Sequence, residues 1–261
     1  MRSLNIAATG MLAQQLNVEV ISNNIANINT TGFKRQRAEF QDLLYQDLRR
    51  AGTASSDTGT VVPSGIQIGI GVKPAATYRI TEQGNLAITD NKLDLAINGR
   101  GYFAVELPSG ETAYTRAGAL GRSPNGDLVT SDGYTVQPGI TIPDDAVQIT
   151  INPQGEVLIS LDGQTAPSNV GQLQLANFPN EAGLQAIGDN LLLETPASGA
   201  ATLASPGSAG FGTIQQGALE TSNVNIVAEI TNLITAQRAY EMNSKVIQAS
   251  DEMLSSVNRL R

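Results

Sequence analysis

The chain has 261 residues, contains no Cys, His or Trp, and carries 24 acidic against 16 basic residues, a net charge of −8. The missing residue types exclude disulfides, Cys or His metal ligands, and Ser-His or Cys-His catalytic relays. The acidic balance argues against nucleic acid as a partner. We therefore expect no catalytic residues, no metal site and no cofactor.

Glycine and proline are concentrated in the middle of the chain. All 11 Pro lie between Pro63 and Pro206, and no Gly follows Gly217. These residues interrupt helices, whereas tight turns require them. The pattern predicts an α+β protein with a long helix at each end and an all-β centre. The expected parts are a terminal helical assembly domain of residues 1–50 and 220–261, an extended linker or stiffening segment of residues 51–65, and a central β domain of residues 66–219.

The first predicted helix has apolar positions that alternate in steps of three and four. This heptad seam consists of Leu4, Ala7, Met11, Gln14, Val18, Ile21, Ile25 and Ile28. Gly32 is expected to end the helix as a left-handed cap. Such a seam predicts packing against another helix.

A dense basic cluster, Lys34-Arg35-Gln36-Arg37, follows the first predicted helix. Nucleic-acid sites interleave basic residues with aromatic ones, whereas Phe33 is the single aromatic residue beside this cluster and the protein as a whole is acidic. We interpret the cluster as a charged surface or a subunit contact.

The central residues are divided by turn dipeptides, which include Asn98-Gly99, Asn125-Gly126 and Asp132-Gly133. Short β-branched or alternating runs lie between these turns. The spacing predicts a hairpin-rich, sandwich-like or barrel-like β domain.

Two patterns in the centre have an alternative interpretation as a binding or catalytic site. Residues 99–104 fit the dinucleotide pattern G-x-G-x-x-A, but the following residues alternate with period two, which favours a hairpin turn. Asp144 with Asp145, and Asp90 with Asp94, are candidate carboxylate pairs. Asp144 and Asp145 follow a proline in a turn pattern, which favours solvated loop acids. A secreted β-domain glycosidase is the alternative function from another class.

The second predicted helix follows a cap that we expect within residues 222–225. Its seam repeats the 4-3 spacing at Ile226, Ile230, Leu233, Gln237, Tyr240, Ser244, Ile247, Asp251 and Leu254. Pairing of the two helices alone would leave other apolar residues uncovered, namely Ile6, Leu12, Leu16, Val20, Val227, Val246 and Val257. The uncovered residues predict self-assembly. A coiled-coil adhesin that forms a closed oligomer of fixed size is the alternative to an open polymer.

The chain resembles the flagellar basal-body rod and hook family at both ends and in the middle. The residues that carry the resemblance are MRSL at 1–4, AATGM at 7–11, ISNNIAN at 21–27, TGFKR at 31–35, INGRGYF at 97–103, AYTRAG at 113–118, SNVN at 222–225 and AQRAYEMNSK at 236–245. Within the family, the length, FQDLLYQ at 40–46 and YEMNSK at 240–245 are most similar to subunits of the distal rod. A hook or proximal rod subunit is the alternative.

The resemblance implies a structural, non-enzymatic subunit that polymerises helically into a hollow, rigid shaft and transmits torque from motor to hook. The implied partners are further copies of the chain, proximal rod subunits, hook or hook-base subunits, the surrounding peptidoglycan and outer-membrane rings, and the flagellar type III export apparatus. Nucleic acid and membrane insertion are not expected. The implied location is the basal body, from periplasm to outer membrane, after export without a cleaved signal peptide.

We expect the subunit interface to lie on the terminal segments. The predicted residues are Leu4, Met11, Val18, Ile21, Ile25, Asn27, Ile28, Phe33, Asn223, Asn225, Ile226, Ile230, Leu233, Gln237, Arg238, Tyr240, Asn243, Lys245, Ile247 and Leu254.

Overall fold

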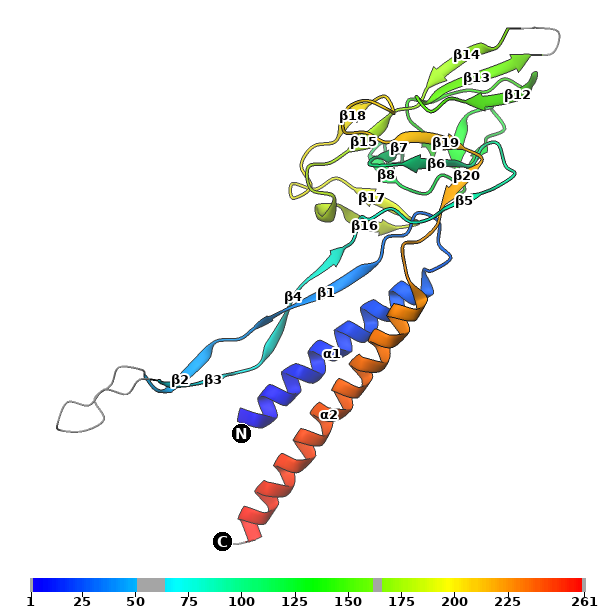
Figure 1. The fold of residues 1–261 in the computed structure, drawn as a ribbon. Helices are drawn as coiled ribbons and strands as arrows, with labels where there is room; N and C mark the ends of the chain where they lie inside the picture. Colours follow the sequence, from blue (N-terminus) through cyan, green and yellow to red (C-terminus); the bar gives the residue numbers. More distant parts are fainter. Residues whose placement is uncertain (1, 51–63, 162–165, 260–261) are drawn as a thin grey trace. The chain divides into compact units, whose positions relative to one another are not determined.

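The computed structural model describes residues 2–50, 64–161 and 166–259 of the chain (Figure 1). They form two compact units, each built from segments that are distant in the sequence. Unit 1 comprises Met1–Ile25, Gln36–Tyr78 and Asn225–Arg261, and unit 2 comprises Ala26–Arg35 and Arg79–Val224. Residues 36–50 group with the terminal helices, as in the predicted division. The boundaries differ elsewhere, because residues 66–78 also group with the helices, whereas residues 26–35 and 220–224 group with the β structure.

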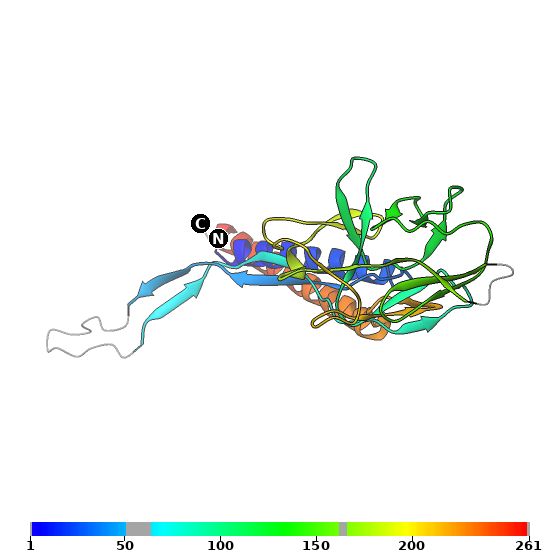
Figure 2. The ribbon, with the colours of Figure 1, turned by 90° about the horizontal axis from the view of Figure 1, so that it is seen from above.

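Unit 1 contains both long helices, and the predicted α+β class with a helix near each end is confirmed. Helix α1 covers Arg2–Ala26 and helix α2 covers Ile226–Arg259. Figures 1 and 2 show the two helices side by side. Asn225 caps α2, since its Oδ1 accepts hydrogen bonds from the amides of Val227 (3.1 Å) and Ala228 (3.2 Å).

Helix α1 ends before its predicted seam does. Ile28 lies beyond the helix, in a turn where the amide of Thr30 donates to the carbonyl of Asn27 (3.2 Å). Gly32 has a φ of +68°, but it is no helix cap, because the helix has already ended at Ala26. A Cβ on Gly32 would lie 2.8 Å from the carbonyl carbon of Arg116, so glycine permits a close backbone approach inside unit 2.

Unit 1 also contains a two-stranded ribbon. Strand β1 (Gln36–Asp42) pairs with β4 (Val72–Arg79), and β2 (Tyr45–Arg49) pairs antiparallel with β3 (Ile66–Gly69). Backbone hydrogen bonds between residues 43 and 71 and between residues 70 and 44 connect the two pairs.

The predicted terminal helical domain of residues 1–50 includes residues 36–49, which belong to the same unit as the helices but form strands. Gly and Pro are rare in this stretch, so its composition fits a helix. In β1, however, half-buried and exposed positions alternate with period two from Gln36 to Phe40, as in a strand. Of the predicted linker, residues 51–65, the part from 51 to 63 lies outside the residues that the structure describes.

Unit 2 contains β structure, as predicted for the centre of the chain. Its elements are β5 (Leu86–Ile88), β6 (Leu95–Asn98), β7 (Tyr102–Glu106), β8 (Thr112–Thr115), β9 (Leu120–Arg122), β10 (Leu128–Thr130), β11 (Thr135–Val136), β12 (Ala146–Ile151), β13 (Glu156–Leu161), β14 (Ser168–Gln172), β15 (Leu175–Asn177), the 3-10 helix η1 (Glu181–Gly183), β16 (Gln185–Gly188), β17 (Leu191–Leu193), β18 (Thr202–Ala204), β19 (Thr213–Gln216) and β20 (Ala218–Glu220).

The largest sheet has the order β16-β17-β8-β7-β11-β10-β9, and β15 pairs with both β7 and β18. Strands β12, β13 and β14 form a second sheet, whereas β6 pairs with β19 and β5 with β20. All of these pairings are antiparallel. Sandwich-like or barrel-like closure of these sheets stays a prediction.

The main core of unit 2 lies around Phe103 and contains large aliphatic side chains such as Leu95, Leu128 and Leu175, all of them fully buried. A smaller cluster contains Tyr102, Tyr114 and Phe178, and the Tyr114 and Phe178 rings meet edge to face at 4.8 Å.

The dinucleotide-like pattern at residues 99–104 leads into strand β7 and not into a helix, as predicted. The prediction that it forms a hairpin turn is wrong, because β6 pairs with β19 while β7 pairs with β8, β11 and β15. The glycines thus connect strands of two different sheets. The strand that pairs with a short apolar run can lie far away in the sequence, as β19 does for β6, so the local pattern does not reveal it.

Candidate assembly interface

Helices α1 and α2 contact each other through polar and small residues. Nδ2 of Asn24 donates to Oε2 of Glu229 (3.3 Å), and the hydroxyl groups of Ser3 and Ser250 lie 3.3 Å apart. Asn24 and Glu229 are only 1% and 4% exposed. The helices run antiparallel, because the start of α1 meets the end of α2 and the end of α1 meets the start of α2.

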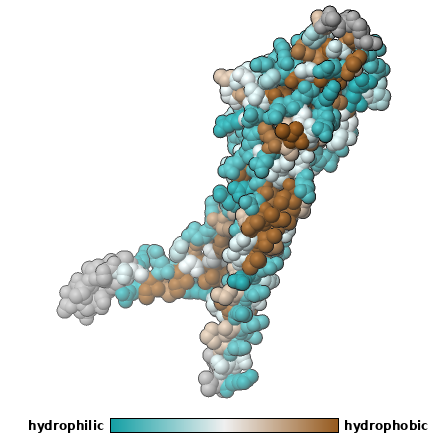
Figure 3. Space-filling view, turned by 45° about the vertical axis from the view of Figure 1, so that its right-hand side comes forward, coloured by the Kyte–Doolittle hydropathy of each residue, from teal (hydrophilic) through white to brown (hydrophobic). Residues whose placement is uncertain are grey.

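Most of the large apolar side chains of α2 are exposed. Val227 and Met242 are 71% and 66% exposed, whereas the buried residues of α2, among those whose exposure is described, are Glu229, Ala236 and Ser250. The exposed set, called the apolar face of α2 below, consists of Ile226, Val227, Ile230, Ile234, Tyr240, Met242, Val246 and Met253. Figure 3 shows apolar side chains at the surface of the helices and of the ribbon.

At three positions of the predicted α2 seam, the residue that is buried in the structure lies one position earlier in the sequence. Glu229, Ala236 and Ser250 are buried in place of residues 230, 237 and 251. Leu233, Ile247 and Leu254 are half-buried, but Ile226 and Ile230 are exposed and Glu229 is buried in their place. Small residues allow two helix backbones to approach closely, and this decides which residues face α1. A pattern that counts apolar residues alone assigns the large side chains to the wrong contact.

The predicted interface residues differ in exposure. Ile21 is buried within unit 1. Exposed members are Asn225, Ile226, Ile230, Gln237, Arg238, Tyr240 and Lys245. Half-buried members are Leu4, Met11, Val18, Ile25, Asn27, Ile28, Phe33, Asn223, Leu233, Asn243, Ile247 and Leu254. Ile234, Met242 and Met253 were missed, although the spacing of Met242, Val246 and Met253 marks a second apolar stripe.

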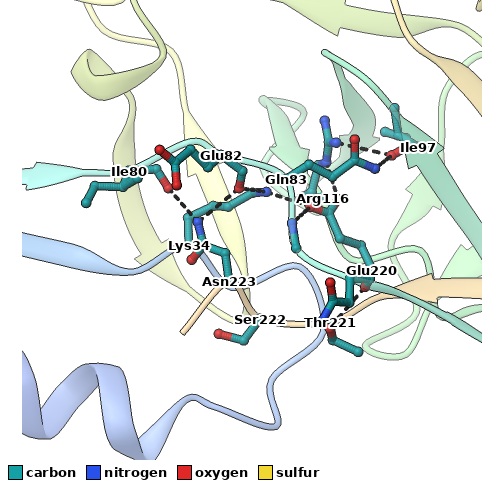
Figure 4. A network of polar contacts seen from close by, with 12 residues as sticks. Lys34, Ile80, Glu82, Gln83, Ile97, Arg116, Glu220, Thr221, Ser222 and Asn223 are labelled. Atoms are coloured by element: carbon teal, nitrogen blue, oxygen red, sulfur yellow. Dashed lines mark hydrogen bonds and ion pairs between the residues drawn. The ribbon is translucent and has the colours of Figure 1, made fainter. Parts of the chain in front are cut away.

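Unit 2 contains a buried charge network, drawn in Figure 4. Nζ of Lys34 lies 2.6 Å from Oε1 of Glu220, and Nε of Arg116 lies 2.5 Å from Oε2. Arg116 also donates to the carbonyls of Gly99 and Gly101, both at 2.6 Å. The network joins a segment that follows α1, a β-strand end, and the segment that precedes α2.

Neighbouring charges keep Glu220 ionised. Burial alone would raise the pKa of Glu220, but the charge of Arg116 and the hydrogen bonds from Lys34 and Arg116 outweigh it, so the pKa lies below its usual value. For Lys34, burial lowers the pKa of the amine, and the hydrogen bond and charge of Glu220 only partly offset this effect.

The interpretation of the basic cluster as surface charge is wrong for Lys34, which is 7% exposed. It holds for Arg37, whose ion pair with Glu39 (2.7 Å) is exposed. A lysine is normally solvated, and only the tertiary position of Glu220, 186 residues away in the chain, makes its burial possible.

Two of the four candidate carboxylates, Asp94 and Asp144, have structural partners, and Asp90 is exposed. Asp144 and Asp145 are exposed in a turn, as predicted, and Asp144 pairs with Arg122. Asp94 is buried and accepts hydrogen bonds from Thr89 (2.7 Å) and Asn91 (2.9 Å). Within the described part of the chain, no three acidic, Cys or His side chains gather as a metal site requires, and no helix has the length and apolar character that crossing a membrane demands.

Three family models match separate parts of the chain. The model described as flagella basal body rod protein matches residues 4–34, the flagellar hook protein FlgE/F/G D1 domain matches residues 96–159, and the flagellar basal body rod FlgEFG protein C-terminal matches residues 215–260.

Known relatives match from end to end. The flagellar basal-body rod protein FlgG of Caulobacter vibrioides is 65% identical over 261 residues, with 100% of each chain covered. FlgG of Agrobacterium fabrum is 55% identical over 259 residues, with 99% of each covered. The chain belongs to the FlgG family of flagellar basal-body rod proteins. FlgG of Bacillus subtilis is 40% identical over 266 residues, and the match covers 100% of this chain and 99% of the Bacillus protein.

The three matched segments meet in the charge network of this FlgG-family chain. Lys34 lies in the first segment, Arg116 in the second and Glu220 in the third. The network therefore fixes where both terminal segments enter unit 2.

Removing Lys34 should destabilise the protein strongly. Lys34→Met leaves Glu220 buried with one cationic partner fewer, and breaking a buried pair in this way costs about 3–5 kcal/mol. Arg37→Met, which breaks an exposed pair of similar length, should cost about 0–1 kcal/mol. Urea unfolding of the purified chain measures both, and equal losses would contradict the role of burial.

Acid should remove the contribution of Glu220. Its pKa is lowered in the folded chain, so its stabilisation is complete above the unfolded pKa of 4.5 and disappears as the pH falls through the folded pKa. The difference in unfolding free energy between wild type and Glu220→Gln should therefore narrow from about pH 7 to about pH 3. A difference that stays constant over this range would show that the charge of Glu220 is not responsible.

Proposed function

We propose that the protein is a structural subunit of the distal rod of the flagellar basal body. The observation that carries this proposal is the end-to-end match, at 65% identity, to a basal-body rod protein. Rod proteins named FlgG match at 40–65% identity, whereas a flagellar hook-basal body complex protein of Bacillus subtilis matches at 32%. The printed name of the relatives with the higher identities, basal-body rod protein, favours the rod over the alternative position in the hook.

In this proposal the subunits polymerise helically into a hollow, rigid shaft that transmits torque from motor to hook. The physical support is the apolar face of α2, which unit 1 leaves uncovered. Full burial of an Ile or Met side chain stabilises by about 1.5–3 kcal/mol, so several such residues per subunit supply the energy for assembly. A contact between two different surfaces that repeats without closing produces an open helical tube.

The terminal helices would form the coiled-coil-like bundle of this shaft. Each α1 and α2 pair would present its apolar face to the helices of neighbouring copies. The antiparallel contacts between Asn24 and Glu229 and between Ser3 and Ser250 support this arrangement, because they leave the large apolar side chains available for other subunits.

We infer the remaining partners and the location from the resemblance to the family. Proximal rod subunits and hook or hook-base subunits would contact the two ends of the shaft, and peptidoglycan and outer-membrane rings would surround it between periplasm and outer membrane. The flagellar type III apparatus would export the chain without a cleaved signal peptide. A glycosidase is not proposed, because Asp94 and Asp144 are held by structural partners and Asp145 lies exposed in a turn.

A charge on the apolar face should block assembly without unfolding unit 2. Ile230→Asp combined with Ile234→Asp buries two carboxylates in the proposed interface, so cells that carry this chain should lose swimming and rods beyond the proximal part. Swimming assays and electron microscopy of purified basal bodies measure the effect.

The matched control is Ile88→Asp, since Ile88 is 84% exposed but lies in unit 2. Circular dichroism of each purified chain verifies that the β structure persists. Normal rods with Ile230→Asp and Ile234→Asp would refute the assembly role of this face.

A further inference from the structure

The contacts between α1 and α2 recur at heptad intervals. From Ser3 to Gly10 to Asn24, α1 advances by 7 and then 14 residues. The partners on α2 go back by the same steps, from Ser250 to Asn243 to Glu229. One register therefore accounts for all three contacts, and these six residues are called the register line below.

Each position of the register line is small or polar. A Cβ on Gly10 would lie 2.8 Å from Nδ2 of Asn243, so the absence of a side chain at Gly10 makes room for this amide. The side-chain Nδ2 of Asn24 donates both to Glu229 and to the backbone carbonyl of Gln36 (2.8 Å). Oδ1 of Asn24 accepts a hydrogen bond from the backbone amide of Gln36 (2.8 Å). Asn24 is thereby fixed to the ribbon as well as to α2.

We propose that the register line sets the axial position of α1 against α2. A shift of one heptad in one direction places Asn24 opposite Ala236, and a shift in the other direction places it opposite residue 222, before α2 begins. Both shifts remove the hydrogen-bond partner of buried Glu229, which penalises them. Most large apolar residues of α2 cannot make this choice, because they are exposed, and the half-buried Leu233, Ile247 and Leu254 recur at heptad-related positions that a shift of one heptad would largely preserve.

The register line has a consequence for assembly. It determines which part of the apolar face of α2 extends past the start of α1, because Ser3 is held at Ser250. Every subunit would then present the same apolar surface to its neighbours. In this respect the inference rests on the proposed function.

Cysteine cross-linking in assembled rods tests the register directly, since the chain contains no Cys. The variant Ser3→Cys with Ser250→Cys should form an intramolecular disulfide under mild oxidation, because the two hydroxyl groups already lie 3.3 Å apart. The control Ser3→Cys with Asn243→Cys reports the register shifted by one heptad and should stay reduced. Non-reducing electrophoresis and peptide mass spectrometry distinguish links within one chain from links between chains.

The outcomes separate the two proposals. Equal linking of both pairs, or a link between residues 3 and 250 that forms only between chains, would overturn the register line while rods still assemble. If the wild-type chain neither restores swimming to a rod-deficient cell nor occurs in its basal bodies, the proposed function fails, and with it the inference.

A second variant tests the role of Gly10. Leucine is a better helix former than glycine, so helix propensity alone predicts that Gly10→Leu strengthens α1. The side chain of Asn243 occupies the space beside Gly10, however, so the new leucine should disturb the contact with α2. We expect loss of the intramolecular link between residues 3 and 250 and its recovery when Asn243→Ala is added. Asn5→Leu, at an exposed position of the same helix, should leave the link intact. A Gly10→Leu chain that links like wild type would overturn the assignment of Gly10.

Discussion

The structure of this protein depends on a contact between two helices that leaves most of the large apolar side chains of α2 exposed. Helix α2 meets α1 through Glu229, Asn243 and Ser250, and it exposes Val227 and Met242. A long helix in water obtains most of its stability from the burial of an apolar face. Since α1 does not cover that face, burial by other copies of the chain, as in the proposed shaft, would couple the stability of the helix to assembly.

The charge network of unit 2 solves a related problem at the points where the chain enters and leaves the β structure. Lys34 and Glu220 lie next to segments that lead to α1 and α2, and Arg116 connects them to the strands. A buried ion pair with complete hydrogen bonding adds little net stability, but it penalises any arrangement that separates its members. The network therefore favours one arrangement of the three segments within unit 2.

Pattern and composition predict the local elements well and their partners poorly. The two helices, the strand-rich centre and the cap at Asn225 follow from helical spacing, turn dipeptides and capping chemistry. Residues 36–49 were assigned to the helical domain because Gly and Pro are rare there, and they form strands because residues 66–79 pair with them. Lys34 was assigned to the surface, since nothing near it in the chain indicates the carboxylate that it meets.

The sequence by itself determined the excluded chemistry, the class of fold and, through the terminal motifs, the family. The absence of Cys and His and the distribution of Gly and Pro are local properties, and a single chain displays them completely. Tertiary structure alone decided which face of each helix meets the other and that Lys34 is buried against Glu220. Each of these outcomes depends on the approach of two segments that are distant in the sequence. Asn243 meets Gly10, and Lys34 meets Glu220, only after the chain has folded.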